Sequence, residues 1–374
     1  MMDEILYVTR PDMPDLQEYV KYLERIWDSR WLTNNGPIHE AFESALCQYL
    51  GVKYLSLYSN ATLALISAFK CLELSGEVIT TPYSFVATSH ALYWNGITPV
   101  FGDVDPIFGN LNPSYIERLI TDRTSAILPV HVYGNPCPLA EIDSIARKYG
   151  LRVVYDAAHS FNVRIGGVPL VNFGDLSILS FHATKVFNTI EGGAIICKDE
   201  ETKRKLDYFK NFGFENETSI VSPGINAKMN ELQAAFGILQ LDSIDLNIQK
   251  RSQIAQRYRE QLKDIKGLRL IPELDHVQHN YSYFPIFVDA SGINFNRDDL
   301  YEYLKINKVY SRRYFYPLIS NIPTYKNLKS SEPQHLIVAN SIAEQVLCLP
   351  IYSTLGLENV DRISKLIKDR FAGI

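Results

Sequence analysis

The sequence predicts an α/β fold, with one large and mostly parallel sheet covered by helices and a smaller α+β unit at the carboxyl end. From about residue 52 to 200, short apolar and β-branched runs alternate with longer stretches of helical period, which is the pattern of a parallel sheet with crossover helices. The chain then turns helical from Lys228 to about Leu262. A second and shorter set of elements follows that helical stretch.

The first unit is predicted to hold seven strands in one large sheet. The candidate strands are Lys53–Tyr58, Glu77–Thr80, Thr98–Phe101, Ser125–Val132, Leu151–Tyr155, Leu176–Phe181 and Gly193–Cys197. Two of the segments between them, Thr62–Leu72 and Leu139–Tyr149, carry their apolar residues on one helical stripe. We therefore expect these two segments to be helices that cover the sheet.

The second unit is predicted to start near residue 245, which gives a first domain of 1–245 and a second of 246–374. The boundary falls in Ile244–Leu262, a long polar helical stretch of the kind that bridges two domains or exposes a wide solvent face. The second unit's candidate elements are a strand near Tyr281–Val288, a helix over Arg297–Ile306 and a helix near Asn359–Phe371. The absence of internal repeats and low-complexity tracts excludes a solenoid.

The composition is that of an ordinary globular protein, and it narrows the classes of partner. The 374 residues carry 37 Lys+Arg against 42 Asp+Glu, a formal net charge of -5, so there is no broad basic field for nucleic acid or an anionic membrane. The 5 cysteines are far apart and are expected to be reduced thiols, with no metal site. Met1–Tyr19 lacks the pattern of a signal peptide, so a cytoplasmic location is expected.

An acidic and a basic side chain follow two strands of the predicted sheet. Asp156 follows the strand Leu151–Tyr155, at the end where ligands of open parallel sheets bind. Lys185 lies between the strand Leu176–Phe181 and a double-glycine turn, where desolvation can lower the pKa of the amine as a Schiff-base nucleophile requires. Taken alone, Asp156 is equally well explained as a turn cap, and most such lysines are solvated loop residues.

A helix start and an aromatic ring are expected at the same edge of the sheet. The turn Ser59–Thr62 opens a helix, whose free N–H groups and positive dipole end favour a phosphate. Phe85 follows the second predicted strand. Taken singly, a plain N-cap and a core phenylalanine explain these residues better. Together with Lys185 and Asp156 they make the parts of a pyridoxal 5′-phosphate (PLP) site: a Schiff-base lysine, a carboxylate for the pyridine nitrogen, a phosphate cradle and a ring against the cofactor face.

Further motifs are spread over nearly the whole chain. With the segments above they are Trp31–Pro37, Ser59–Leu65, Thr81–Thr88, Asp156–Ser160, Ser180–Ala194, Gly224–Ala235, Tyr314–Leu318 and Leu347–Leu355. As a set they resemble the sugar aminotransferases of the DegT/DnrJ/StrS family, which have the aspartate aminotransferase fold (fold type I). The family usually has Gly in place of Ala61 and often an acidic residue in place of Leu63, so the phosphate turn departs from its pattern.

The resemblance implies a role for each candidate site residue. Lys185 would form the Schiff base with PLP, Asp156 would pair with the protonated pyridine nitrogen, and Phe85 would stack on the ring. His159 would lie near the ring hydroxyl. The phosphate would be held by the amides of Ala61 and Thr62, by the hydroxyl of Ser180 and, from the neighbouring subunit, by Asn226. This last contact implies a homodimer with shared active sites.

The resemblance also implies an activity, a PLP-dependent aminotransferase with L-glutamate as donor and a nucleotide-linked keto sugar as acceptor. The lysine motif Ser180–Asn188 is most similar to the branch that acts at C4 of dTDP-4-keto-6-deoxyglucose, whereas the branch acting at C3 more often has Tyr-Pro-Gly-Lys. Arg312 and Arg313, beside Tyr314, are candidates to hold the substrate diphosphate. They are equally well explained as a solvated pair on a surface loop.

The sequence also bears on four alternative functions. A related sugar dehydratase replaces the Schiff-base lysine by histidine, and Lys185 argues against it. A non-enzymatic binding or regulatory protein on the same fold would be expected to lose Lys185 or Asp156, and the chain has no basic helix-turn-helix. A hydrolase built on Asp156 and His159 lacks a Gly-x-Ser-x-Gly elbow. An aminotransferase that acts on a 3-keto sugar stays open.

Overall fold

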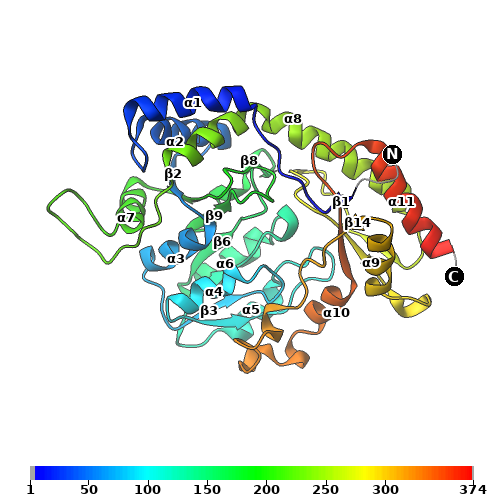
Figure 1. The fold of residues 1–374 in the computed structure, drawn as a ribbon. Coiled ribbons are helices and arrows are strands. Elements are labelled where there is room, and N and C mark those ends of the chain that lie inside the picture. Colours follow the sequence, from blue (N-terminus) through cyan, green and yellow to red (C-terminus); the bar gives the residue numbers. More distant parts are fainter. Residues whose placement is uncertain (1–4, 373–374) are drawn as a thin grey trace.

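The computed structural model describes residues 5–372. A large sheet with helices around it forms the greater part of the molecule, and the carboxyl-terminal elements form a smaller part beside it (Figure 1). The predicted α/β class is confirmed. Residues 1–4 and 373–374, which the two expected domains include, lie outside the described residues.

The large sheet has seven strands in the order β2-β10-β9-β6-β5-β3-β4. They are β2 (Tyr54–Tyr58), β3 (Glu77–Thr80), β4 (Thr98–Phe101), β5 (Thr124–Leu128), β6 (Arg152–Asp156), β9 (Leu176–Ser180) and β10 (Gly193–Cys197). Only β10 runs antiparallel to its neighbours in this sheet. The strand expected over Ser125–Val132 ends early, at Leu128, because Pro129 has no N–H for the ladder.

Both faces of the large sheet are buried, as the continuous apolar strands predicted. Along β10, Ala194 and Ile196 pack into one apolar core, while Ile195 and Cys197 pack into the core of the opposite face. The helices of this part are α1 (Leu16–Ser29), α2 (Pro37–Leu50), α3 (Ala61–Cys71), α4 (Ala87–Trp94), α5 (Pro113–Leu119), α6 (Leu139–Tyr149) and α7 (Glu200–Lys210). The two helices expected in this part correspond to α3 and α6. Among residues 5–372, no helix has both the length and the apolar character needed to cross a membrane.

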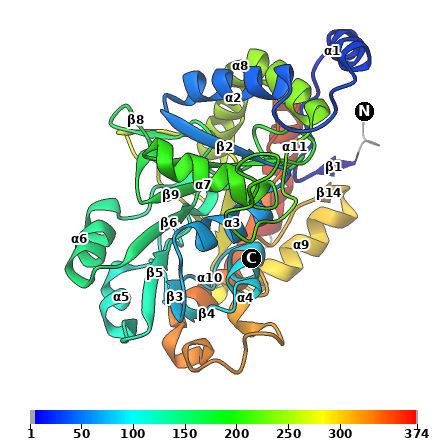
Figure 2. The ribbon, with the colours of Figure 1, turned by 90° about the vertical axis from the view of Figure 1, so that its left-hand side faces the viewer.

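The smaller part is built on a three-stranded antiparallel sheet in the order β11-β13-β15. Its elements are β11 (Leu268–Leu270), β13 (Phe284–Val288), α9 (Arg297–Ile306), β14 (Val309–Tyr310), α10 (Ile337–Gln345), β15 (Val346–Leu349) and α11 (Leu357–Ala372). The remaining strands are β1 (Leu6–Tyr7), which pairs with β14, and the small sheet of β12 (Val277–Gln278), β7 (Arg164–Ile165) and β8 (Val168–Pro169). Figure 2 shows β1 and β14 beside α9.

One long helix, α8 (Glu231–Leu262), runs through both parts without a break. Ile244 belongs to the core around α2 and the large sheet, whereas Ile254 belongs to the core of the smaller sheet. The expected boundary at residue 245 therefore falls inside a single helix, and the division into two domains stays a prediction. Leu6, although expected in the first domain, packs into the core of the smaller sheet.

The start of α8 holds the start of α2. The buried carboxylate of Glu231 accepts hydrogen bonds from the backbone N–H groups of Ile38, at 3.1 Å, and His39, at 2.7 Å. Those N–H groups have no acceptor within α2, so the carboxylate satisfies them and complements the positive end of the helix. A Cβ atom at Gly36 would lie 2.6 Å from Cδ of Glu231, so a side chain there would collide with the carboxylate. The Trp31–Pro37 motif thus has a packing role.

We predict that Glu231→Ala lowers the free energy of unfolding by about 2 kcal/mol, because it leaves two amides at the start of α2 without acceptors. Denaturant unfolding followed by circular dichroism measures the change. Glu24→Ala, at an exposed position on α1, is the control and should change the free energy by less than about 0.5 kcal/mol. Equal stability of the two variants would contradict the capping role.

Candidate active site

Lys185 lies in the loop between β9 and β10, with its side chain half-buried. Its backbone N–H donates to the carbonyl of His182 at 2.8 Å, which closes a tight turn after the strand. Burial lowers the pKa of the Lys185 amine to about 8, and the carboxylate of Asp156 partly opposes this shift. A larger fraction of the amine is therefore unprotonated near neutral pH than in an exposed lysine.

Asp156 is the last residue of β6, where it is buried. One carboxylate oxygen accepts from the Thr88 hydroxyl at 2.8 Å, and the other accepts from the backbone N–H of Ala158 at 3.1 Å. Burial raises the pKa of Asp156, while these two hydrogen bonds and the charge of Lys185 lower it. The carboxylate is thus fixed in direction and can accept from a cationic N–H group placed before it.

His159 lies in the loop after β6, with its ring stacked parallel to that of Phe315 at a centroid distance of 5.7 Å. Burial and the charge of Lys185 lower its pKa well below the ordinary value, so the ring is neutral at physiological pH. Its Nδ1 accepts from the backbone N–H of Tyr133 at 3.2 Å. The single ring proton is thereby assigned to Nε2, which can donate to an oxygen acceptor.

The predicted phosphate turn lies beside Ser180. Across neighbouring strands, Ser180 is in register with Gly193, which is in register with Tyr58 at the end of β2. A Cβ atom at Gly193 would lie 2.8 Å from the backbone nitrogen of Ala61, so only glycine allows this close approach. In the part of the chain that the structure describes, the N–H groups of Ala61 and Thr62 have no acceptor, since Asn60 caps α3 through a later N–H.

These groups fit PLP. A helix start with two free N–H groups and a neighbouring hydroxyl suits a phosphate, and a buried carboxylate suits a protonated pyridine nitrogen. The amine of Lys185 is close enough to Asp156 for their charges to interact, which places both groups at one site. The structure thus brings Lys185, Asp156, His159 and Ser180 to the carboxyl edge of the sheet, as the sequence predicted.

Phe85 and Asn226 are exposed in the single chain. Phe85 lies in the turn before α4 with 60% of its surface exposed, so its ring is free to lie against a flat ligand. Asn226 follows a long loop that projects from the body of the molecule after α7 (Figure 1). Its side-chain oxygen accepts from Nζ of Lys228 at 2.7 Å. The expected contact of Asn226 with a neighbouring subunit stays a prediction.

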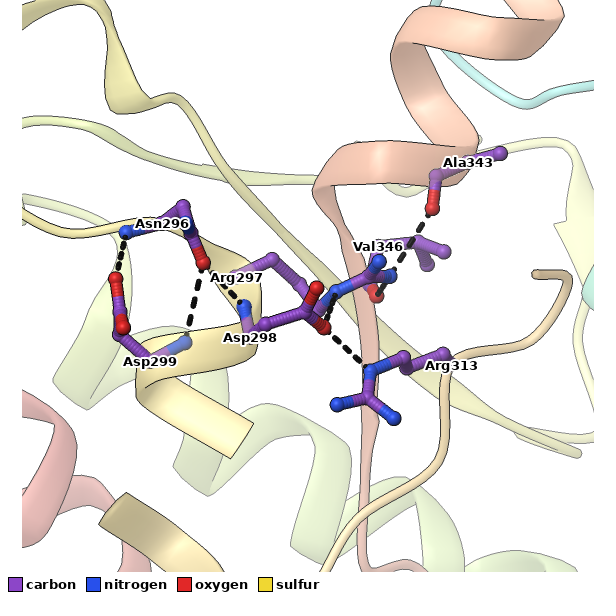
Figure 3. A network of polar contacts seen from close by, with 7 residues as sticks. All are labelled: Asn296, Arg297, Asp298, Asp299, Arg313, Ala343 and Val346. Carbon is purple, nitrogen blue, oxygen red and sulfur yellow. Dashed lines mark hydrogen bonds and ion pairs between the residues drawn. The ribbon is translucent and has the colours of Figure 1, made fainter. Parts of the chain in front are cut away.

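The candidate substrate residues lie on the segment between β14 and α10. Nε of Arg313 donates to Asp298 of α9 at 2.6 Å, and its guanidinium lies 3.7 Å from the ring centroid of Tyr301. Asp298 also accepts from Arg297, which is anchored on the carbonyls at the end of α10 (Figure 3). Arg312 is exposed. The sequence did not predict the acidic partner of Arg313.

Three site residues were not identified from the sequence: Thr88, Tyr133 and Tyr283. Thr88 lies inside the Thr81–Thr88 motif, and a hydroxyl in a motif next to a predicted carboxylate site is a signal that could have identified it. Tyr133 and Tyr283 act through contacts between segments far apart in the chain. The hydroxyl of Tyr283 lies 3.3 Å from Nζ of Lys185, although the two residues are 98 positions apart in the chain. No local pattern indicates such a contact.

The chain is similar to known proteins over nearly its whole length. The model of the DegT/DnrJ/EryC1/StrS aminotransferase family matches residues 15–368. The dTDP-4-amino-4,6-dideoxy-D-glucose transaminase of Escherichia coli is 50% identical over 98% of this chain and 99% of its own. A solved structure of DesI in the presence of its TDP-sugar product is 35% identical, with a TM-score of 0.93 over 98% of this chain and 93% of the other.

A solved structure of NtdA from Bacillus subtilis with bound cofactor PMP is 30% identical, with a TM-score of 0.86 over 96% of this chain and 82% of the other. The predicted family, fold type, enzyme class and cofactor are confirmed by these matches, and the non-enzymatic alternative is thereby excluded. The chain belongs to the DegT/DnrJ/EryC1/StrS aminotransferase family and is a PLP-dependent sugar aminotransferase.

Proposed function

We propose that this enzyme transfers the amino group of L-glutamate to C4 of dTDP-4-keto-6-deoxy-D-glucose, and that it works as a cytoplasmic homodimer. The observation that carries the substrate is the 50% identity, over nearly the full length of both chains, to a relative named for dTDP-4-amino-4,6-dideoxy-D-glucose. The His-Ala-Thr-Lys form of the lysine motif also supports reaction at C4 over C3. The placement of Lys185 against Asp156 supports the transamination itself.

Lys185 is the group that moves protons in this proposal. When bound, PLP supplies an electron sink for the carbon that carries the amino group. Once its amine is free, Lys185 would take a proton from that carbon as general base and deliver it to the cofactor as general acid. The pKa of about 8 suits both roles, because the amine can gain and lose a proton near physiological pH.

Asp156 and His159 fix the two polar sides of the cofactor ring in this proposal. The carboxylate of Asp156, oriented by Thr88, would hold a proton on the pyridine nitrogen. Nε2–H of His159 would be the donor to the ring hydroxyl oxygen, since Nδ1 is occupied by the backbone N–H of Tyr133. The N–H groups at the start of α3 and the Ser180 hydroxyl would hold the phosphate, and Phe85 would cover one ring face. Each residue thus keeps the role that the resemblance implies.

We predict that Lys185→Ala folds normally but forms no covalent bond with PLP. Lys185 lies on a loop and its side chain is only half-buried, so the change removes the nucleophile without opening a core cavity. The measurement is intact mass after borohydride reduction of protein incubated with PLP. Lys198→Ala, at an exposed position, is the control and should carry one reduced cofactor like the parent. A reduced cofactor on the Lys185 variant at parental yield would disprove the assignment.

The shared site is tested by mixing two inactive variants. Asn226→Asp places a carboxylate against the phosphate and should be inactive, as should Lys185→Ala. If Asn226 acts in the partner's site, mixed dimers contain one intact site, and about a quarter of the parental activity should return after the chains are exchanged. Activity is measured as 2-oxoglutarate release. Lack of recovery in dimers shown to be mixed would place Asn226 in its own chain's site.

The carbon that is aminated is tested with a pair of substrates. We predict that dTDP-4-keto-6-deoxyglucose and glutamate give a 4-amino sugar nucleotide, and that a 3-keto isomer reacts at least about 100-fold more slowly, because a displacement of about 1 Å misplaces the reacting carbon. The product carbon is located by NMR. Amination at C3 at a comparable rate would move this enzyme to the neighbouring branch without changing the cofactor site.

A further inference from the structure

Tyr283 makes the direct polar contact with the amine of Lys185. Nζ of Lys185 donates to the hydroxyl of Tyr283 at 3.3 Å, and among the described residues no other hydrogen bond of this nitrogen is recorded. Nζ also lies 5.8 Å from the centroid of the Tyr283 ring. Lys185 belongs to the part built on the large sheet, whereas Tyr283 immediately precedes β13 of the smaller sheet. The contact therefore joins the two parts at the reacting group.

The ring of Tyr283 is held by three other rings. The ring of His159 lies 4.9 Å away in an edge arrangement, that of Tyr314 lies 5.6 Å away in an edge arrangement, and that of Tyr133 lies 5.7 Å away. These rings come from three separate segments of the chain. Burial raises the pKa of Tyr283, so the hydroxyl stays protonated at physiological pH. The hydroxyl is thus a neutral group at a fixed place.

We propose that Tyr283 is a positioning residue, whose hydroxyl holds the free amine of Lys185 at the place from which it attacks the cofactor and moves protons. A lysine side chain has four flexible bonds, and a productive approach requires the reacting atoms to be about 3–3.5 Å apart. One hydrogen bond to a fixed hydroxyl removes much of this freedom. The phenol can accept from the charged amine and can also donate to the neutral one, so it serves both states.

The charged and titratable groups around this contact come from several elements. Asp156 at the end of β6 raises the pKa of Lys185, and Lys185 in turn lowers that of His159. In addition to burial, the charges of Cys348 and Asp156 raise the pKa of the Tyr283 phenol, and the charge of Arg251 lowers it. Because the hydroxyl accepts from the ammonium, it favours the charged form of Lys185, and its removal should lower the pKa of the amine.

The test compares Tyr283→Phe with Tyr281→Phe in the cofactor-free protein. The first variant keeps the ring and its three aromatic contacts and loses only the hydroxyl. The second variant removes the hydroxyl of Tyr281, two positions earlier on the same segment. This hydroxyl makes no hydrogen bond with Lys185 among the described residues. The rate at which a trace of acetic anhydride labels Lys185 is measured by mass spectrometry across the pH range. The midpoint should lie near pH 8 in the parent and should fall by roughly half a unit in Tyr283→Phe.

The second measurement is the rate at which PLP is captured by the cofactor-free protein, followed by absorbance above the pH midpoint. Here the amine is neutral, and we expect capture to be about tenfold slower in Tyr283→Phe, because the amine is no longer held in place. Tyr281→Phe should match the parent in both measurements. A parental midpoint and capture rate in Tyr283→Phe would show that its ring serves packing alone. Equal changes in both variants would equally overturn the proposal, since they would reflect general loosening of the segment.

Discussion

The burial of the Lys185 amine is the constraint on which the rest of the site depends. An exposed lysine is almost fully protonated at neutral pH, and burial is what lowers the pKa of this one to about 8. The turn after β9 supplies the lysine, and the hydroxyl of Tyr283, from the smaller part, lies 3.3 Å from its amine. Burial also raises the pKa of Asp156, and the attraction between the two groups limits both shifts. The relative position of the two parts must therefore be maintained for the chemistry to occur.

The long helix α8 connects the two parts, and its first turn anchors it to the part built on the large sheet. Its Glu231 holds the start of α2, and the side chain of Gln233 donates to the carbonyl of Glu191 at 2.6 Å and approaches that of Ser59 at 3.5 Å. Glu191 lies in the loop that carries Lys185, and Ser59 is the first residue of the phosphate turn. The same helix start thus ties together the segments that carry the amine and the phosphate cradle. The far end of α8 lies in the core of the smaller sheet.

The features that could be predicted from the sequence are those that depend on residues close together in the chain. Short apolar and β-branched runs indicate strands, so β3, β4 and β10 were predicted with the bounds that the structure has. Asp156 and Lys185 were identified because parallel strands end at one edge of a sheet. Tyr283 could not be predicted, because its contact with Lys185 depends on how the smaller sheet packs against the larger one. The salt bridge of Arg313 with Asp298 could not be predicted either, because it depends on how the segment after β14 packs against α9 within the smaller part.

That salt bridge bears on how the proposed diphosphate would be bound. The chain has a net charge of -5, so the substrate's negative charges require a local basic group. Arg297, Asp298 and Arg313 together leave one positive charge, and Arg297 is buried on the carbonyls of Ala343 and Val346 (Figure 3). Since the hydrogen bond to Asp298 occupies only Nε of Arg313, its terminal nitrogens stay available as donors. An arginine already held by a carboxylate and an aromatic ring loses less side-chain entropy on binding than exposed Arg312, so Arg313 is the better placed of the two proposed contacts.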